Sequence, residues 1–104
     1  MDEPEIPLDT LTEADFAPRL GQKFHMRLRG DEGIDLVLAE VTPQRFPMPN
    51  AKRAGFSIVF RSTLPGAAPQ AIYTLVHEEM GSMSLFLVPL GPKDGGMRYE
   101  AVFG

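Results

Sequence analysis

The sequence predicts an all-β domain, a small antiparallel six-stranded barrel or sandwich with one short N-terminal helix. Short runs rich in aliphatic, β-branched and aromatic residues recur along the chain, as in strands. The ten prolines and ten glycines fall mostly between these runs, where they mark turns. At 104 residues the chain is large enough for one core, so we expect a single β domain over 11–104 behind a flexible arm over 1–10.

The segment 11–16 is a helix-start signal, and Pro18 and Gly21 bound the expected helix to one or two turns. It follows an arm that Pro4 and Pro7 keep from being helical. Thr12 is a good N-cap, and Asp15 stands where a capping box places its acidic residue. Gly21 is a natural residue just past the helix end. The face expected to be buried holds Leu11, Phe16 and Leu20.

The first strand is predicted over 22–29, because apolar and polar residues alternate there with a period of two. Its solvent-exposed face carries a basic stripe, which is a candidate binding surface made of Lys23, His25, Arg27 and Arg29. A second, returning strand is predicted over 34–42, and Asp35 and Glu40 are expected to lie opposite the basic stripe.

The longest predicted connection is 43–54, in which three prolines oppose a regular strand. Loops of this length in compact domains tend to be functional or disordered. The candidate partner-binding residues of this loop are Phe46, Met48, Lys52 and Arg53.

A third strand is expected over 55–63, a central hairpin over 71–90, a turn over 91–96 and a last strand over 97–103. Gly81 suits the positive φ that a tight hairpin turn requires. The second hairpin strand is apolar at consecutive positions, 85–88, which is typical of strands buried on both faces. The first and last strands are the expected sheet edges, which recruit other chains when left uncovered.

Composition excludes several classes of function. The net charge of −4 argues against nucleic acid as the main partner. The absence of cysteine excludes disulfides, thiolate metal sites and cysteine nucleophiles, and it favours the cytoplasm or an assembly made there. No signal peptide or membrane span is expected.

The chain resembles a family of small bacterial domains of unknown function, DUF6916. The resemblance is carried by 11–16, Pro18, 20–21 and Phe24 near the start and by 85–89 and 97–103 near the end. The resemblance runs from about Leu11 to the end of the chain. It implies no catalytic residue, since these motifs are strand and turn signatures. It implies a structural or assembly role, in the setting of phage-tail-like genes.

The two histidines are the candidate metal ligands or bases. His25 lies on the wet face of its strand, and His77 precedes Glu78 and Glu79. Their spacing matches no zinc motif, so no metal site, cofactor or catalytic residue is expected.

We therefore expect a non-catalytic interaction or structural module that self-associates or docks into a larger assembly. The contact would use an edge strand, the 43–54 loop or the N-terminal arm. The alternative is a small-ligand-binding β-barrel whose mouth offers Tyr73, Tyr99 and His77 as polar contacts. An enzyme is the third hypothesis, because no acid, base and nucleophile converge in the sequence.

Overall fold

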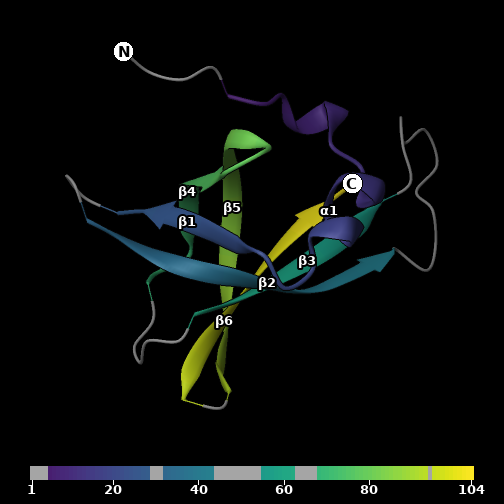
Figure 1. Cartoon of the computed structure of the whole chain (residues 1–104). Coiled ribbons are helices and arrows are strands. Elements are labelled where there is room, and N and C mark those ends of the chain that lie inside the picture. Colours follow the sequence, from purple (N-terminus) through teal and green to yellow (C-terminus); the bar gives the residue numbers. More distant parts are fainter. Residues whose placement is uncertain (1–4, 29–31, 44–54, 63–67, 94) are drawn as a thin grey trace.

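Six antiparallel strands close into one barrel, in the order β1-β2-β3-β6-β5-β4 (Figure 1). The structure is a computed structural model, which describes residues 5–28, 32–43, 55–62, 68–93 and 95–104. The predicted all-β class with one short helix is confirmed, and the barrel is the correct one of the two architectures. The strands are β1 (Lys23–Arg27), β2 (Gly33–Pro43), β3 (Phe56–Ser62), β4 (Ala71–His77), β5 (Gly81–Lys93) and β6 (Gly96–Phe103).

The prediction that the first and last strands form sheet edges is wrong. β1 pairs with both β2 and β4, and β6 lies between β3 and β5. The β1–β4 pairing is short, from His25 opposite Val76 to Met26 opposite Leu75. These long-range pairings are not encoded in the local pattern of any one strand, so the sequence could not reveal them.

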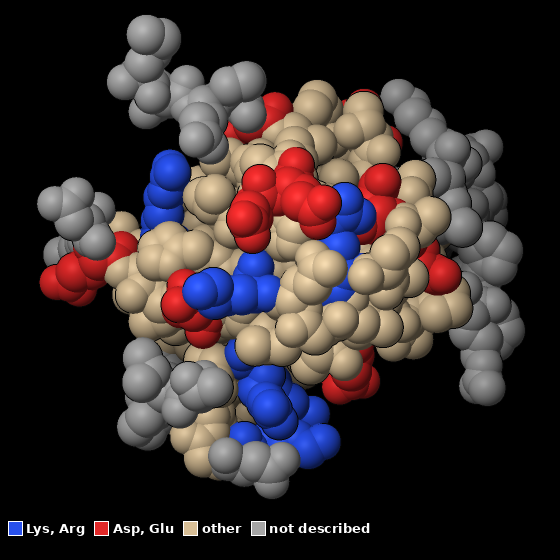
Figure 2. Space-filling model, viewed as in Figure 1, with Lys and Arg blue, Asp and Glu red and all other residues tan. Residues whose placement is uncertain are grey.

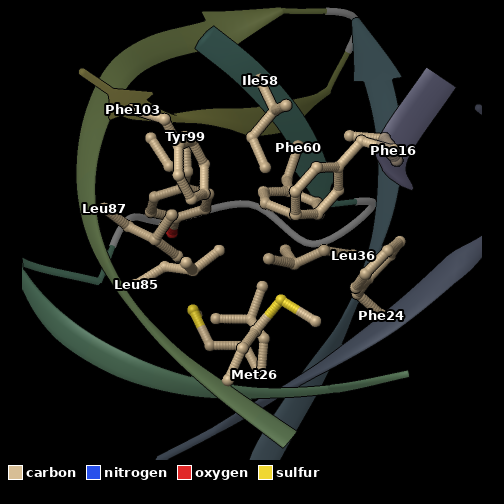
Figure 3. Close-up of a cluster of buried hydrophobic side chains, with 14 of the residues drawn as sticks. Phe16, Phe24, Met26, Leu36, Ile58, Phe60, Leu85, Leu87, Tyr99 and Phe103 are labelled. Atoms are coloured by element: carbon tan, nitrogen blue, oxygen red, sulfur yellow. The ribbon is translucent and has the colours of Figure 1, made fainter. Parts of the chain in front are cut away.

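The inner face of the barrel is filled with apolar side chains from every strand (Figure 3). β1 shows the rule: its alternating exposed and buried positions leave Phe24 and Met26 fully buried. The buried cluster is Leu11, Phe16, Phe24, Met26, Leu36, Leu38, Phe56, Ile58, Phe60, Leu75, Met83, Leu85, Leu87, Tyr99, Ala101 and Phe103.

The short helix α1 (Glu13–Phe16) contributes Phe16 to this cluster. The Phe16 ring lies 5.9 Å from that of Phe56 and 5.6 Å from that of Phe103. The predicted cap forms, because the Thr12 N–H donates to Asp15 Oδ2 at 2.8 Å. The helix continues as a 3-10 turn, η2 (Ala17–Arg19).

Two details after the helix test the sequence prediction. Gly21 has a φ of +85°, as expected for a residue just past the helix end. The expectation that Leu20 shares the buried face is wrong, because Leu20 is 48% exposed. The 3-10 turn has fewer residues per turn than an α-helix, so α-helical spacing does not hold beyond Phe16.

The segment before the helix lies along the first part of β5. The Ile6 N–H donates to the Ser82 carbonyl at 2.9 Å, and Ser84 Oγ donates to Glu5 Oε1 at 2.6 Å. A 3-10 turn, η1 (Leu8–Thr10), follows. β5 pairs with β6 only from Val88 onward, so this segment occupies the place beside β5 that β6 does not reach.

β5 corrects the sequence prediction twice. It extends to Lys93, through most of the expected turn over 91–96. Its prolines, Pro89 and Pro92, lie beyond Leu87, where β4 begins, so this part of β5 has one neighbouring strand fewer and needs fewer N–H donors. The prediction that 85–88 is buried on both faces is also wrong, since Phe86 is 50% exposed on the outside of a single-layered barrel wall.

Candidate interaction surface

The predicted binding residues of the 43–54 loop, Phe46, Met48, Lys52 and Arg53, lie outside the described residues, as does Arg29 of the basic stripe. The other members of the stripe, Lys23, His25 and Arg27, are exposed on the outer face of β1. Their alternation with buried residues is the pattern that the sequence predicted.

Asp35 of β2 neutralises part of this stripe. His25 Nδ1 lies 3.0 Å from Asp35 Oδ1, and Lys23 Nζ lies 3.8 Å from Asp35 Oδ2. Asp35 is thus opposite the stripe, as expected, whereas Glu40 lies past a bulge and opposite Val59 of β3. Among the described residues, Arg27 has no carboxylate partner.

The His25 ring lies directly over Gly33. A Cβ added to Gly33 would come within 2.3 Å of His25 Nε2 and 2.8 Å of the Met26 carbonyl oxygen. Both distances are shorter than real Cβ contacts, so only glycine fits beneath the ring in this arrangement. His25 therefore lies against Gly33 on the outer wall of the barrel, beside Asp35.

The other histidine, His77, is buried at the end of β4. Its Nδ1 accepts the N–H groups of Glu79 and Met80, at 3.0 and 3.1 Å, so this nitrogen carries no proton. Its Nε2–H therefore donates to Gln22 Oε1 at 2.7 Å. Burial first, and Arg19 second, lower the pKa of His77, which keeps the ring neutral.

This hydrogen bonding makes His77 a cap for the β4–β5 turn. A surface cavity of about 450 Å³ brings His77 and His25 together with Gln22, Lys23 and Glu79. Both nitrogens of His77 are already used by groups of the chain. Within the described residues, no cluster of His, Asp and Glu is arranged to hold a metal ion.

The tyrosines proposed as polar contacts at the barrel mouth are also engaged. The Tyr99 hydroxyl accepts the Ala68 N–H at 2.9 Å, and the Tyr73 hydroxyl donates to the Pro69 carbonyl. Burial, followed by the nearby Tyr99, raises the pKa of Tyr73, so its hydroxyl stays a neutral donor. These bonds fix the chain at 68–69 against the barrel.

The outer face of β4, β5 and β6 carries large exposed apolar residues. Ile72 of β4 is directly opposite Phe86 of β5, and they are 71% and 50% exposed. Val88 of β5 pairs with Glu100 of β6, and beyond this pair, where the two strands separate, Phe86 and Val102 line one surface cavity. Val102 is 71% exposed. We call Ile72, Phe86 and Val102 the apolar row.

A surface cavity of about 370 Å³ opens beside the apolar row, where β5 and β6 diverge. Phe86 and Val102 line it with Leu8 of the N-terminal segment, which is 41% exposed. Sequence reasoning missed this surface. The signal was present in the consecutive apolar residues over 85–88, which predict a strand buried on both faces.

Basic side chains form a second cluster that the sequence did not reveal. Arg61 of β3 is directly opposite Arg98 of β6. Figure 2 shows Lys and Arg gathered at the end of the molecule that holds the β5–β6 hairpin. Neither Arg61 nor Arg98 takes part in the ion pairs found among the described residues. The two residues therefore form a like-charge pair across neighbouring strands.

The family model for a domain of unknown function, DUF6916, matches residues 11–103. The chain belongs to this family. The match covers the whole barrel and the helix that enters it, so the DUF6916 domain is the closed barrel with its helix. No curated protein and no solved structure matches the chain. No helix among the described residues of this DUF6916 domain is long and apolar enough to cross a membrane.

Proposed function

We propose that this DUF6916 domain is a non-catalytic interaction module that self-associates or docks into a larger assembly through the apolar row. The observation that carries the proposal is the exposure of Ile72, Phe86 and Val102 on neighbouring strands of one outer face. An assembly of the phage-tail-like kind is the setting that the family resemblance implies.

The physical argument is that the fold does not need these side chains. The core is complete on the inner face, where Leu85 and Leu87 of the same strand are buried. Covering an exposed apolar side chain is favourable by roughly 25 cal/mol per Å² of area removed from water. Adjacent exposed apolar residues of this size are typical of contact surfaces.

The route of contact differs from the one expected from sequence. Strand addition to β1 or β6 has less support, because each strand pairs with a neighbour on both sides over part of its length. The contact therefore involves side chains on the outer wall. The loop residues Phe46, Met48, Lys52 and Arg53 and the basic stripe stay predictions for additional contacts.

The ligand-binding alternative has less support. The barrel interior is filled with side chains in Figure 3. Tyr73, Tyr99 and His77 use their polar atoms on groups of the chain itself. No observation on the described residues favours this alternative over contact through the outer wall.

The test uses Phe86→Ser, with Leu20→Ser as the matched control from an exposed apolar position elsewhere. Size-exclusion chromatography with light scattering, and binding to partners captured from the native host, are measured for both variants and the wild type. We expect Phe86→Ser to lose association while Leu20→Ser retains it. Equal association in all three proteins would contradict the proposal.

A further inference from the structure

Two arginines face each other across neighbouring strands of the outer wall. Arg61 of β3 is directly opposite Arg98 of β6, and we call these two residues the arginine pair. Both side chains point outward, because the adjacent residues Phe60 and Tyr99 are buried on the inner face. Residues directly opposite each other have Cβ atoms about 4.5–5.5 Å apart, so two guanidinium groups extend from one small area of wall.

The register of the sheet extends the arginine pair into a line across the barrel. Val37 of β2 is opposite Arg61, and Lys23 of β1 is opposite Val37. Lys23 is thus two strand spacings from Arg61, or about 10 Å, and adds to the positive potential there. On the other side, Arg98 is opposite Gly91 of β5. A Cβ built on Gly91 would meet no other atom within 4 Å, so the space beside the arginine pair is open.

The described part of the chain leaves the donors of the arginine pair unused. No ion pair joins either arginine to a described carboxylate, although Glu100 lies two residues from Arg98 on the same strand. Arg98 Nε is buried and has no hydrogen-bond partner among the described residues. Like charges directly opposite each other destabilise a sheet, and a buried N–H without an acceptor costs further free energy. An anion beside the pair would offset the repulsion and supply acceptors.

The chemistry of the guanidinium group favours one class of anion. Each guanidinium is planar and presents its N–H donors as a fork, which fits two oxygens of a phosphate or a carboxylate. A phosphate ester at pH 7 carries a charge of about −1.5 to −2 and three acceptor oxygens. A carboxylate has a single charge and two oxygens. Two forks with two positive charges therefore match one phosphate group better than one carboxylate.

From this arrangement we infer that Arg61 and Arg98 form a binding site for a phosphate group, to which both guanidinium groups donate. The ligand occupies the open space beside Gly91. The inference goes beyond the proposed function, because it concerns a small anionic group and not an apolar contact. The two surfaces are also separate, since Arg98 is four residues before Val102, or about 13 Å along a strand.

Titration with inorganic phosphate, followed by NMR of the isotope-labelled protein, tests the site. Sodium chloride keeps the ionic strength constant, and acetate serves as the carboxylate probe. The site is exposed to solvent and screened by salt, so we expect a Kd in roughly the millimolar range. Shifts should saturate at the amides of Arg61 and Arg98, with acetate binding several-fold more weakly. Shifts that are no larger with phosphate than with acetate would overturn the inference.

Three variants separate a bidentate site from a general effect of charge. Arg61→Gln changes an exposed residue and should weaken phosphate binding by about fivefold or more, because a charge-assisted fork is lost. Arg61→Lys should lose less, since it keeps the charge without the fork. Arg27→Gln makes the same charge change at an exposed position of β1 and should retain binding within about twofold. Equal weakening by Arg27→Gln and Arg61→Gln would overturn the site.

A second titration identifies the source of the phosphate group. It uses a phosphoserine peptide whose other residues are uncharged. Binding at least as tight as that of inorganic phosphate assigns the site to a phosphate carried on a protein, and weaker binding assigns it to a free anion. Binding of neither probe overturns the site. The proposed contact through the apolar row is judged separately, by the association of Phe86→Ser, so the two failures are distinguishable.

Discussion

The outer faces of β1–β2 and of β4–β6 differ, although both stretches of wall bury the same kind of inner face. On β1, exposed positions carry Lys23, His25 and Arg27, and Asp35 of β2 is paired with the first two. On β4–β6 the corresponding outer positions carry Ile72, Phe86 and Val102. The charged wall is suited to water, whereas the apolar wall gains free energy when something covers it.

This difference separates what the fold requires from what contact requires. Both walls contribute inner residues to one buried cluster, so either outer face would be compatible with the barrel. Outer residues that the fold does not need are free to serve a partner. Substitutions on the two faces of the same strands test this separation.

The largest effect is expected from neighbours on opposite faces of β5. Leu85 is 1% exposed and Phe86 is 50% exposed. Leu85→Ala should lower the free energy of unfolding by about 2–5 kcal/mol, because it leaves a cavity in the core. Phe86→Ala should change it by roughly 0.5 kcal/mol or less. Chemical denaturation of both variants at low protein concentration measures the difference, and similar losses would contradict the separation of the two faces.

The next effect concerns the charged wall. Gly33→Ala should destabilise the protein by about 1–3 kcal/mol, because its Cβ would clash with the His25 ring and the Met26 carbonyl. The double variant with His25→Ala should recover part of this loss, since only the backbone clash then remains. Denaturation curves of the single and double variants measure the recovery. A full loss in the double variant would show that the His25 ring is not what excludes a side chain.

The inward-facing His77 predicts a dependence of stability on pH. Its pKa is lowered in the folded state, so folding favours the neutral ring. Its contribution should be complete above the unfolded-state pKa of about 6.5, and it should be lost as the pH falls below that value toward the folded-state pKa.

The variant His77→Gln should lose about 1–3 kcal/mol at pH 8, because two partly buried N–H groups lose their acceptor. It should also lose less stability than the wild type on acidification from pH 6.5. Thermal unfolding over this range measures both effects. An unchanged pH slope would argue against a neutral, buried His77 as the turn cap.

The smallest effect is a gain. Arg61→Thr removes one member of the cross-strand pair with Arg98, and Thr suits an exposed strand position. We expect a stabilisation of about 0.2–1 kcal/mol that shrinks at high salt, as expected for like charges opposite each other. A loss of stability would indicate that Arg61 has a favourable contact that outweighs the repulsion.

The sequence predicted the elements well because their signals are local. The alternation over 23–27, the Thr12 and Asp15 cap and the positive φ of Gly81 at +98° each depend on a few neighbouring residues. The strand order, the closure between β1 and β4 and the length of β5 depend on contacts between distant segments. Local patterns do not contain that information.

The candidate surface was harder to predict for a different reason. A run such as 85–88 is apolar at consecutive positions whether a second protein layer or a partner covers its outer face. The sequence shows that both faces are apolar, but it does not show how many layers the fold has. Only the structure shows that the barrel wall is one sheet thick. Among the described residues, no second layer packs on its outer side at Phe86.

Closure of the barrel has a consequence for how such a domain can diversify. Its strands pair with one another around the barrel, so recognition through the wall depends on a small number of outward side chains. Those positions can be exchanged without rebuilding the scaffold. A lineage of such barrels could therefore acquire new associates through a few point changes at one face, while its architecture stays constant.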